Sequence, residues 1–153
     1  QIRLDLITAA MRDHVTESLS RKVRQVHVRH ILLSEESRAQ TALQQLEQGE
    51  NFILTARQFS EDETTRASGG DLGFLPKGVM PPAFEEVAFS LEAGQISDII
   101  HTKSGLHIVQ VVEIDPERPV ADKFWPMLQQ KAFEHWLVGQ RAEASIQRNM
   151  HNQ

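Results

Sequence analysis

The sequence contains no cysteine among its 153 residues. Disulfide bonds, thiolate metal sites and cysteine nucleophiles are therefore excluded, while the redox state of the compartment stays open. No apolar run approaches the roughly 18 residues that a membrane-spanning helix needs, so no membrane insertion is expected within this segment. Positive charge is not in excess either, because 16 Lys and Arg stand against 21 Asp and Glu. Proteins that bind nucleic acid usually carry a basic patch, so nucleic acid is not an expected partner.

The chain opens on Gln1 rather than on methionine. We interpret the sequence as a processed or excised piece and expect any signal peptide or anchor to lie outside it. Its length fits one ordinary domain with helical extensions. Hydrophobic residues make up 40% and charged residues 24%, which are normal proportions for a soluble globular protein.

The N-terminal segment, residues 1–24, has the pattern of a helical flank. Its apolar residues recur at spacings near 3.6, which predicts one or two amphipathic helices. These residues are Ile2, Leu6, Ala9, Ala10, Val15, Leu19 and Val23.

The C-terminal segment, residues 116–153, is expected to contain a linker and one long helix. Pro116 and Pro119 mark the linker, and Pro126 can occupy the first turn of the helix. The apolar positions of the helix are Leu128, Ala132, Phe133, Trp136, Leu137 and Ala144. We expect this helix to pack against the N-terminal segment.

The central segment, residues 25–115, alternates apolar strands with capped helices. Two of the strands are apolar at both odd and even positions, as expected for strands that are covered on both faces. The predicted strands are Val26–Leu33, Leu72–Leu75 and Leu106–Ile114. Ser34 and Asn51 are expected to cap the first two helices, and Pro81-Pro82 can open a third. The pattern predicts an α+β unit with helices packed on a sheet.

The seven histidines are candidates for a metal site or for catalysis. His27 and His30 have H-x-x-H spacing, but residues i and i+3 of a strand point to opposite faces of the sheet. These two side chains therefore cannot share a metal ion, and the usual zinc spacings are missing. Four other histidines are expected at the surface: His14, His101, His135 and His151.

His30 and His107 differ from the rest because each lies within an apolar strand, where an unpaired imidazole is costly. The two side chains can satisfy each other if the first and last strands are neighbours. Thr102 and Ser104 lie just before His107 and can extend the hydrogen-bond network. From the pattern alone, a pair of mutually satisfied core histidines is favoured over a functional site.

Other chemistries find little support in the sequence. No G-x-S-x-G elbow of a serine hydrolase is present. The glycine-rich turn at 69–73 lacks the Lys-Ser/Thr of a phosphate-binding loop. From the pattern alone, Asp62 belongs to a solvated acidic helix end. Met80 and Phe84 are four residues apart, which indicates core packing or a helix edge.

Six short motifs nevertheless occur in a recognisable order with similar spacing, and together they resemble the parvulin (rotamase, PpiC-type) family. The resemblance covers about residues 26–114. The motifs are VRHILL at 28–33, FSED at 59–62, GGDLGF at 69–74, GVMPPAFE at 78–85, GQIS at 94–97 and TKSGLHI at 102–108.

The resemblance implies a four-stranded antiparallel sheet surrounded by helices and a peptidyl-prolyl cis/trans isomerase that needs no cofactor or metal. It assigns His30 and His107 as the paired histidines at the floor of the active site. Thr102 matches the hydroxyl that bonds to this pair, and Ser104 matches the neighbouring polar position. Asp62 takes the position that holds Asp or Cys in the family.

The same resemblance assigns Leu72, Met80 and Phe84 to the apolar pocket that receives the proline ring. Some parvulins prefer phosphorylated Ser/Thr before proline and use a basic cluster after the first strand. Here that stretch is Ser34-Glu35-Glu36, which is short and acidic. Phosphate recognition is therefore not expected, and the expected substrate is an unphosphorylated X-Pro bond.

Helical flanks on both sides of such a core resemble those of bacterial periplasmic or surface foldases. This resemblance implies an extracytoplasmic location, clients that are unfolded proline-containing polypeptides, and terminal helices able to form a chaperone module or a homodimer. A peptide-binding chaperone with a parvulin fold and little isomerase activity is the alternative to an active enzyme.

Overall fold

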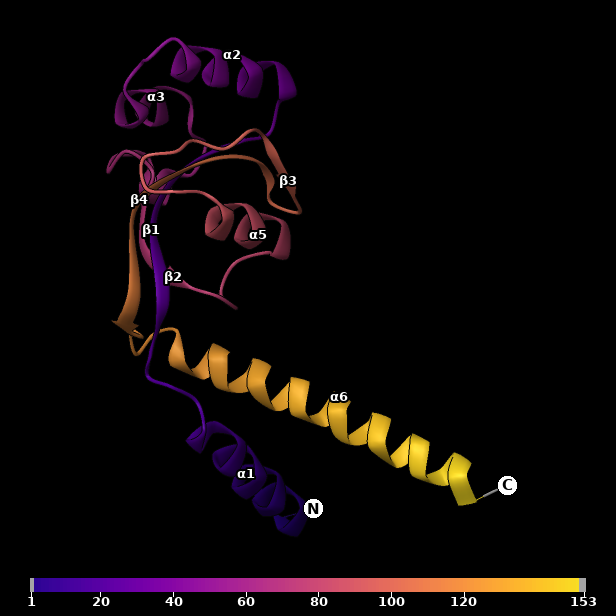
Figure 1. The fold of residues 1–153 in the computed structure, drawn as a ribbon. Coiled ribbons are helices and arrows are strands. Elements are labelled where there is room, and N and C mark those ends of the chain that lie inside the picture. Colours follow the sequence, from indigo (N-terminus) through magenta and orange to yellow (C-terminus); the bar gives the residue numbers. More distant parts are fainter. Residues whose placement is uncertain (1, 152–153) are drawn as a thin grey trace. The chain divides into compact units, whose positions relative to one another are not determined.

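The computed structural model describes residues 2–151, and it divides into two compact units. One unit spans residues 22–118, and the other combines the terminal segments up to Arg21 and from Pro119. Figure 1 shows the elements of each unit in sequence colours. The side chains of Ile2 and His151, which enter the sequence predictions, lie outside the described part.

A four-stranded sheet forms the centre of the 22–118 unit, with the strand order β2-β1-β4-β3. The pairs β1/β2 and β3/β4 are antiparallel. The strands are β1 (Lys22–Leu33), β2 (Asp71–Pro76), β3 (Ile100–Thr102) and β4 (Gly105–Pro119). This sheet with its surrounding helices confirms the predicted α+β fold. It also makes β1 and β4 neighbours, as a contact between His30 and His107 requires.

Both long strands extend beyond their predicted bounds. β1 starts at Lys22, four residues before the apolar run; Lys22 and Arg24 are exposed there, whereas Gln25 is buried. β4 continues to Pro119, so Pro116 and Pro119 lie within a strand and the predicted linker is wrong. β3 pairs only with Gly105–His107. Farther along β4, Gln110 bridges Ile96, and among the described residues no strand pairs with this side at Pro116 or Pro119, where a residue without an N–H group is tolerated.

Helices cover the sheet and carry the segments that build the site. They are α2 (Glu36–Glu47), α3 (Phe52–Phe59), α4 (Glu63–Arg66) and α5 (Pro82–Ser90). Asn51 caps α3 as predicted, because its side chain accepts from the N–H groups of Ile53 and Leu54. The predicted cap at Ser34 is wrong, since the N-cap of α2 is Glu35 and makes no side-chain cap bond. Pro82 occupies the first turn of α5, where its missing N–H costs nothing.

The core of this unit lies between the sheet and the pair α2/α3 (Figure 1). Ile31 and Leu33 of β1 and Ile108 of β4 are buried against these two helices. The buried helix residues are Ala39, Ala42 and Leu46 of α2 and Phe52 and Ala56 of α3. This apolar layer fixes the end of β1 and the adjoining part of β4, which carry the two histidines.

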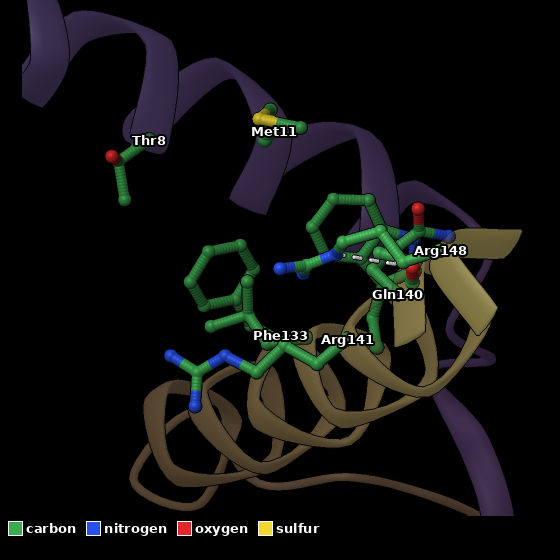
Figure 2. Close-up of a pocket in the computed structure, with 9 residues that line it drawn as sticks. Thr8, Met11, Phe133, Gln140, Arg141 and Arg148 are labelled. Atoms are coloured by element: carbon green, nitrogen blue, oxygen red, sulfur yellow. Dashed lines mark hydrogen bonds between the residues drawn. The ribbon is translucent and has the colours of Figure 1, made fainter. Parts of the chain in front are cut away.

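The terminal unit contains the helices α1 (Ile2–Glu17) and α6 (Trp125–His151), which contact each other. A single helix forms, which is one of the two predicted alternatives, but it ends at Glu17, and Val23 already belongs to β1. The Arg12 guanidinium lies 5.3 Å from the centre of the Phe133 ring. Thr8 and Met11 of α1 line an open groove together with residues of α6 (Figure 2). Within the described residues, no helix combines the length and apolarity needed to cross a membrane.

Candidate active site

The two buried histidines meet at the centre of the 22–118 unit. His30 of β1 and His107 of β4 are each only 4% exposed, and their Nδ1 atoms lie 3.2 Å apart. The rings are stacked, with centroids 5.4 Å apart. The predicted contact between the two imidazoles is therefore present, and each satisfies one buried nitrogen of the other.

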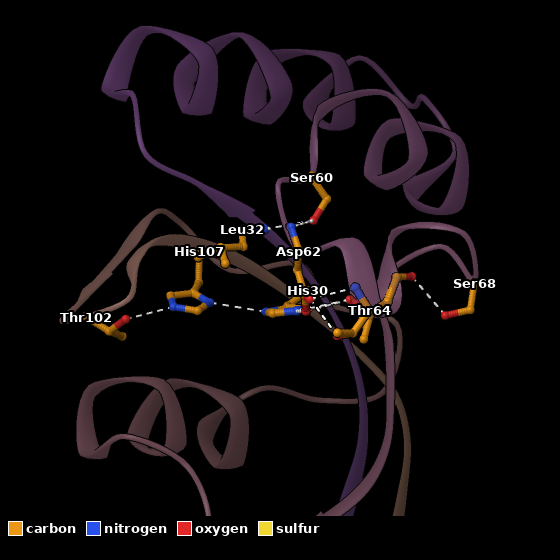
Figure 3. A network of polar contacts seen from close by, with 9 residues as sticks. His30, Leu32, Ser60, Asp62, Thr64, Ser68, Thr102 and His107 are labelled. Atoms are coloured by element: carbon orange, nitrogen blue, oxygen red, sulfur yellow. Dashed lines mark hydrogen bonds and ion pairs between the residues drawn. The ribbon is translucent and has the colours of Figure 1, made fainter.

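The outer nitrogen of each imidazole also has a partner, so the polar contacts form one continuous chain (Figure 3). His30 Nε2 lies 2.7 Å from Asp62 Oδ2. His107 Nε2 lies 2.7 Å from Thr102 Oγ1. The structure thus brings together all four of the polar residues that the resemblance assigns to catalysis. Their catalytic roles stay predictions.

The direction of this hydrogen-bond chain follows from the charge on Asp62. An ionised carboxylate only accepts, so His30 Nε2 carries the proton and donates to it. A neutral His30 then accepts at Nδ1, which makes His107 Nδ1 the donor. His107 Nε2 is left to accept from the Thr102 hydroxyl. One tautomer is therefore assigned to each ring, and all four ring nitrogens are occupied.

Asp62 lies at the N-cap of α4, and four donors reach its carboxylate. Oδ2 accepts from His30 Nε2 and, at 2.8 Å, from Thr65 Oγ1. Oδ1 accepts from the Thr64 hydroxyl at 2.6 Å and from the Thr64 N–H at 3.1 Å. A carboxylate offers about four lone-pair positions. Asp62 is accordingly a saturated anchor for the network rather than an open general base.

Burial and hydrogen bonding set the protonation states of these groups. Burial is the main cause that lowers the pKa of His30, and it outweighs the opposing effect of Asp62. Burial and the neighbouring His30 lower the pKa of His107 to about 4. Burial by itself would raise the pKa of Asp62, but hydrogen bonds from Thr64, Thr65 and His30 together hold it well below its ordinary value. At neutral pH the network therefore contains two neutral imidazoles and one carboxylate.

Backbone contacts hold His30 in place. The His30 N–H donates to Gly70 O at 2.9 Å, and a Cβ atom at Gly70 would lie 2.0 Å from His30 O. The positive φ of 79° at Gly70 also favours glycine. The register of β1 and β2 shifts between Val28 and Arg29, just before the histidine. Such irregularities are common beside active sites, where they re-aim a side chain.

The apolar residues assigned to the proline pocket differ in their exposure. Phe84 is 1% exposed, and its ring meets His30 and His107 edge-on at centroid distances of 6.3 and 5.6 Å. Met80 and Leu72 are half-buried. Met80 and Phe84 also line a narrow crevice that has no room for a water molecule and includes neither Leu72 nor a histidine. Phe84 thus packs edge-on against both imidazoles, while Met80 and Leu72 stay partly exposed.

The side chains of Ser104 and His27 lie outside the polar network. The Ser104 side chain is exposed, and Ser104 reaches the network only through its backbone N–H, which donates to Thr102 Oγ1 at 3.2 Å. His27 Nε2 pairs with Asp71 Oδ1 at 2.8 Å, separately from His30. Over the described residues, no group of three or more His, Cys, Asp or Glu side chains is arranged to hold a metal ion.

Sequence reasoning missed three residues that support Asp62, namely Ser60, Thr64 and Thr65. Thr65 bonds to its carboxylate, and Ser60 Oγ accepts from the N–H groups of Leu32 and Asp62 at 3.2 and 3.3 Å. Ser60 therefore ties the loop before α4 to the end of β1. The available signal was Asp62 itself, since aspartate is a preferred N-cap and its donors lie two or three residues later.

The lowered histidine pKa values predict a loss of stability in mild acid. In the unfolded chain the pKa of His107 has its ordinary value of 6.5, whereas in the folded chain it is about 4. The free energy of unfolding should therefore be highest above pH 6.5 and should fall as the pH decreases from about 6.5 to about 4. At about 1.4 kcal/mol per pKa unit, we expect on the order of 2 kcal/mol to be lost between pH 7.5 and pH 5.

Urea unfolding at the two pH values measures this effect. The matched control is His107→Asn, which removes one of the titrating groups and should show a smaller difference. Asp62 contributes separately, because its lowered pKa makes its stabilisation disappear only below its ordinary pKa of 3.8. Equal unfolding free energies at pH 7.5 and pH 5 would contradict the assigned neutral state of the pair.

Comparison with known proteins gives the family context of this geometry. Residues 30–113 match the family model described as rotamase, PPIC-type PPIASE domain. A protein named foldase protein PrsA of Oceanobacillus iheyensis is 40% identical over 102 residues, which cover 67% of this chain and 34% of that protein. The chain thus spans about a third of the length of this curated relative.

Two solved structures share the fold. The peptidylprolyl isomerase PrsA from Bacillus anthracis has a TM-score of 0.63 and 28% identity, covering 84% of this chain and 61% of its own. The parvulin NmPin of Nitrosopumilus maritimus has a TM-score of 0.54 and 33% identity, covering 59% of this chain and 97% of its own. The match to the family model lies within the unit that contains the histidine pair.

Proposed function

The chain belongs to the PPIC-type PPIase (rotamase) family, and from this membership we propose that it catalyses cis/trans isomerisation of X-Pro bonds in unfolded or extended polypeptides. Its likeness to proteins named foldase and peptidylprolyl isomerase supports a role in protein folding. Uncatalysed isomerisation takes tens to hundreds of seconds, which is slow enough to limit folding.

The saturated polar network is the observation that carries this proposal. Each of the four imidazole nitrogens has a hydrogen-bond partner, and the Asp62 carboxylate accepts from four donors. Such a site has neither a free base nor a nucleophile to offer a substrate, which disfavours hydrolysis and group transfer. Prolyl isomerisation needs neither, because it makes and breaks no covalent bond.

The reaction requires stabilisation of a twisted amide. Resonance in the peptide bond gives a rotation barrier of about 18–20 kcal/mol. An enzyme lowers this barrier by binding the twisted form more tightly than either planar form. We assign the proline ring to the half-exposed apolar side chains of Leu72 and Met80, with Phe84 and the imidazoles beneath them. The fixed tautomers give this floor a constant charge distribution, which costs no reorganisation during the rotation.

The charges after β1 support an unphosphorylated substrate. Ser34, Glu35 and Glu36 connect β1 to α2 and carry no positive charge. Arg38 is the next basic residue, and its guanidinium is 2.7 Å from the Glu61 carboxylate. A phosphate group before the proline would therefore meet negative charge where a phosphate-binding site needs Arg or Lys.

The proposed activity can be tested with peptides of the type Ala-X-Pro-Phe. We expect the chain to accelerate cis/trans exchange above the spontaneous rate, as measured by exchange NMR without a coupling protease. A matched peptide with phosphoserine before proline should be accelerated less than its serine counterpart, because of the acidic β1–α2 segment. Absence of acceleration for both peptides would remove the enzyme hypothesis. A preference for the phosphopeptide would show that the substrate class is wrong.

The terminal segments are the part of the chain that we assign to binding client polypeptides. We propose that the segments up to Arg21 and from Pro119 flank the isomerase as a helical module, which contacts unfolded polypeptide or a second copy of the chain. Exposed apolar side chains on α1 and α6 support this assignment, among them Leu6, Ile7, Met11, Val138 and Ile146. The resemblance to extracytoplasmic foldases supports a location outside the cytoplasm. A peptide-binding chaperone without isomerase activity is the alternative, and the exchange measurement distinguishes the two.

A further inference from the structure

Thr65 occupies a central position in the polar network, although none of the family motifs in the sequence includes it. Its hydroxyl oxygen lies 2.8 Å from Asp62 Oδ2 and 3.3 Å from His30 Nε2. Because the carboxylate only accepts, the hydroxyl proton of Thr65 points to Asp62. The Thr65 oxygen can then accept the weaker branch of a bifurcated hydrogen bond from His30 Nε2–H.

The backbone of Thr65 is fixed to the same histidine by a second route. Its carbonyl accepts from the Gly70 N–H at 2.8 Å and from the Ser68 N–H at 3.0 Å. The Gly70 carbonyl in turn accepts from the His30 N–H at 2.9 Å. The Thr65 hydroxyl is therefore held in place relative to His30 on both the side-chain and the backbone side.

The orientation of one carboxylate oxygen determines the tautomers of both histidines. The two Nδ1 atoms lie 3.2 Å apart, so one of them must donate and the other must accept. His30 accepts at Nδ1 only while its single proton stays on Nε2, facing Asp62 Oδ2. If Oδ2 turned away, that preference would weaken, and both rings would have to change tautomer together. Thr64 binds only the other oxygen, Oδ1.

We propose that Thr65 is a positioning residue of this site, whose hydroxyl holds the Asp62 oxygen that faces His30 and so keeps both imidazoles in one tautomer. The consequence for catalysis rests on the proposed isomerase function. Loss of one hydrogen bond to a charged group is expected to lower kcat/KM about tenfold. The consequence for the tautomers does not depend on that function.

The test compares the wild-type chain with Thr65→Val, which removes the hydroxyl at nearly constant shape, and with Thr65→Ser, which keeps it. Imidazole ¹⁵N spectra report the tautomers, and exchange NMR on an X-Pro peptide reports kcat/KM. We expect wild type and Thr65→Ser to show protonated Nε2 in His30 and protonated Nδ1 in His107. Thr65→Val should give averaged nitrogen shifts for both rings and about a tenfold lower kcat/KM.

The control is Thr41→Val, which removes a threonine hydroxyl that bonds to Ser37 O on the exposed face of α2. It should match the wild type in both measurements. Thr65→Ala, measured in parallel, provides a second hydroxyl deletion if the valine variant does not fold. Unchanged nitrogen shifts in the folded deletion variant would overturn the proposal, as would a serine variant that behaves like the deletion. If the wild-type chain does not accelerate exchange, the proposed function fails, while the nitrogen shifts still decide the role of Thr65.

Discussion

Replacing Phe84 by alanine is expected to destabilise the protein by about 3–5 kcal/mol and to remove most of its isomerase activity. The ring is 1% exposed and contacts both imidazoles edge-on, so its loss leaves a cavity directly beneath the histidine pair. From the sequence motif alone, this ring is expected to serve the substrate more than the fold. Its burial indicates that it serves both, because the same side chain belongs to the core and contacts the histidine pair.

Urea unfolding and peptide exchange together test this expectation. Phe84→Leu retains most of the volume, so it should stay folded and show how far activity depends on the aromatic ring. Phe89→Ala is the matched control, since Phe89 lies on the same helix but is only half-buried. It should cost less stability than Phe84→Ala. Wild-type stability in Phe84→Ala would contradict the assigned packing, and wild-type activity would show that the proposed proline site is misplaced.

Removing either histidine of the pair is expected to weaken both the fold and catalysis. His30→Ala leaves His107 Nδ1 buried without a partner, and His107→Ala does the same to His30. An unsatisfied buried polar group costs about 1–3 kcal/mol, in addition to the packing that is lost. In the double variant neither imidazole remains to be left without its partner. Its destabilisation should therefore be smaller than the sum of the single effects.

A double-mutant cycle on unfolding free energies measures this coupling. We expect an interaction energy of about 0.5–3 kcal/mol for His30 and His107. The control cycle combines His107→Ala with His27→Ala, because His27 pairs with Asp71 instead. That cycle should be additive to within about 0.5 kcal/mol. Additivity in the histidine pair itself would show that the two imidazoles do not depend on each other.

The fold was predictable where long apolar runs dominate the sequence. β1 and β4 carry apolar residues at both odd and even positions because α2, α3 and α5 cover their buried parts. β3 and α4 were not expected from the pattern, since three and four residues are too few to show a period. The ends of β4 were misplaced because prolines predict a break, whereas at a sheet edge they are tolerated.

The candidate site was predictable to a different degree. Two histidines in apolar strands had to be paired because buried imidazoles need partners, and this physical rule led to the observed contact. Asp62 was identified only through the family motif, since an acidic residue among acidic neighbours has the pattern of a solvated helix end. Thr65 lies outside the six motifs and Ser60 lies within FSED without an assigned role, because their importance depends on how the 60–70 segment folds back on β1.

The proposed mechanism requires that this site isomerises prolyl bonds without transferring a proton. Every imidazole nitrogen and both Asp62 oxygens are engaged within the network, so the rotation must be assisted by binding alone. The most direct test is the exchange rate of an X-Pro peptide measured with the chain in H₂O and in D₂O. We expect the same acceleration in both solvents. An acceleration that falls clearly in D₂O would show that a proton moves in the rate-limiting step, and would contradict this mechanism.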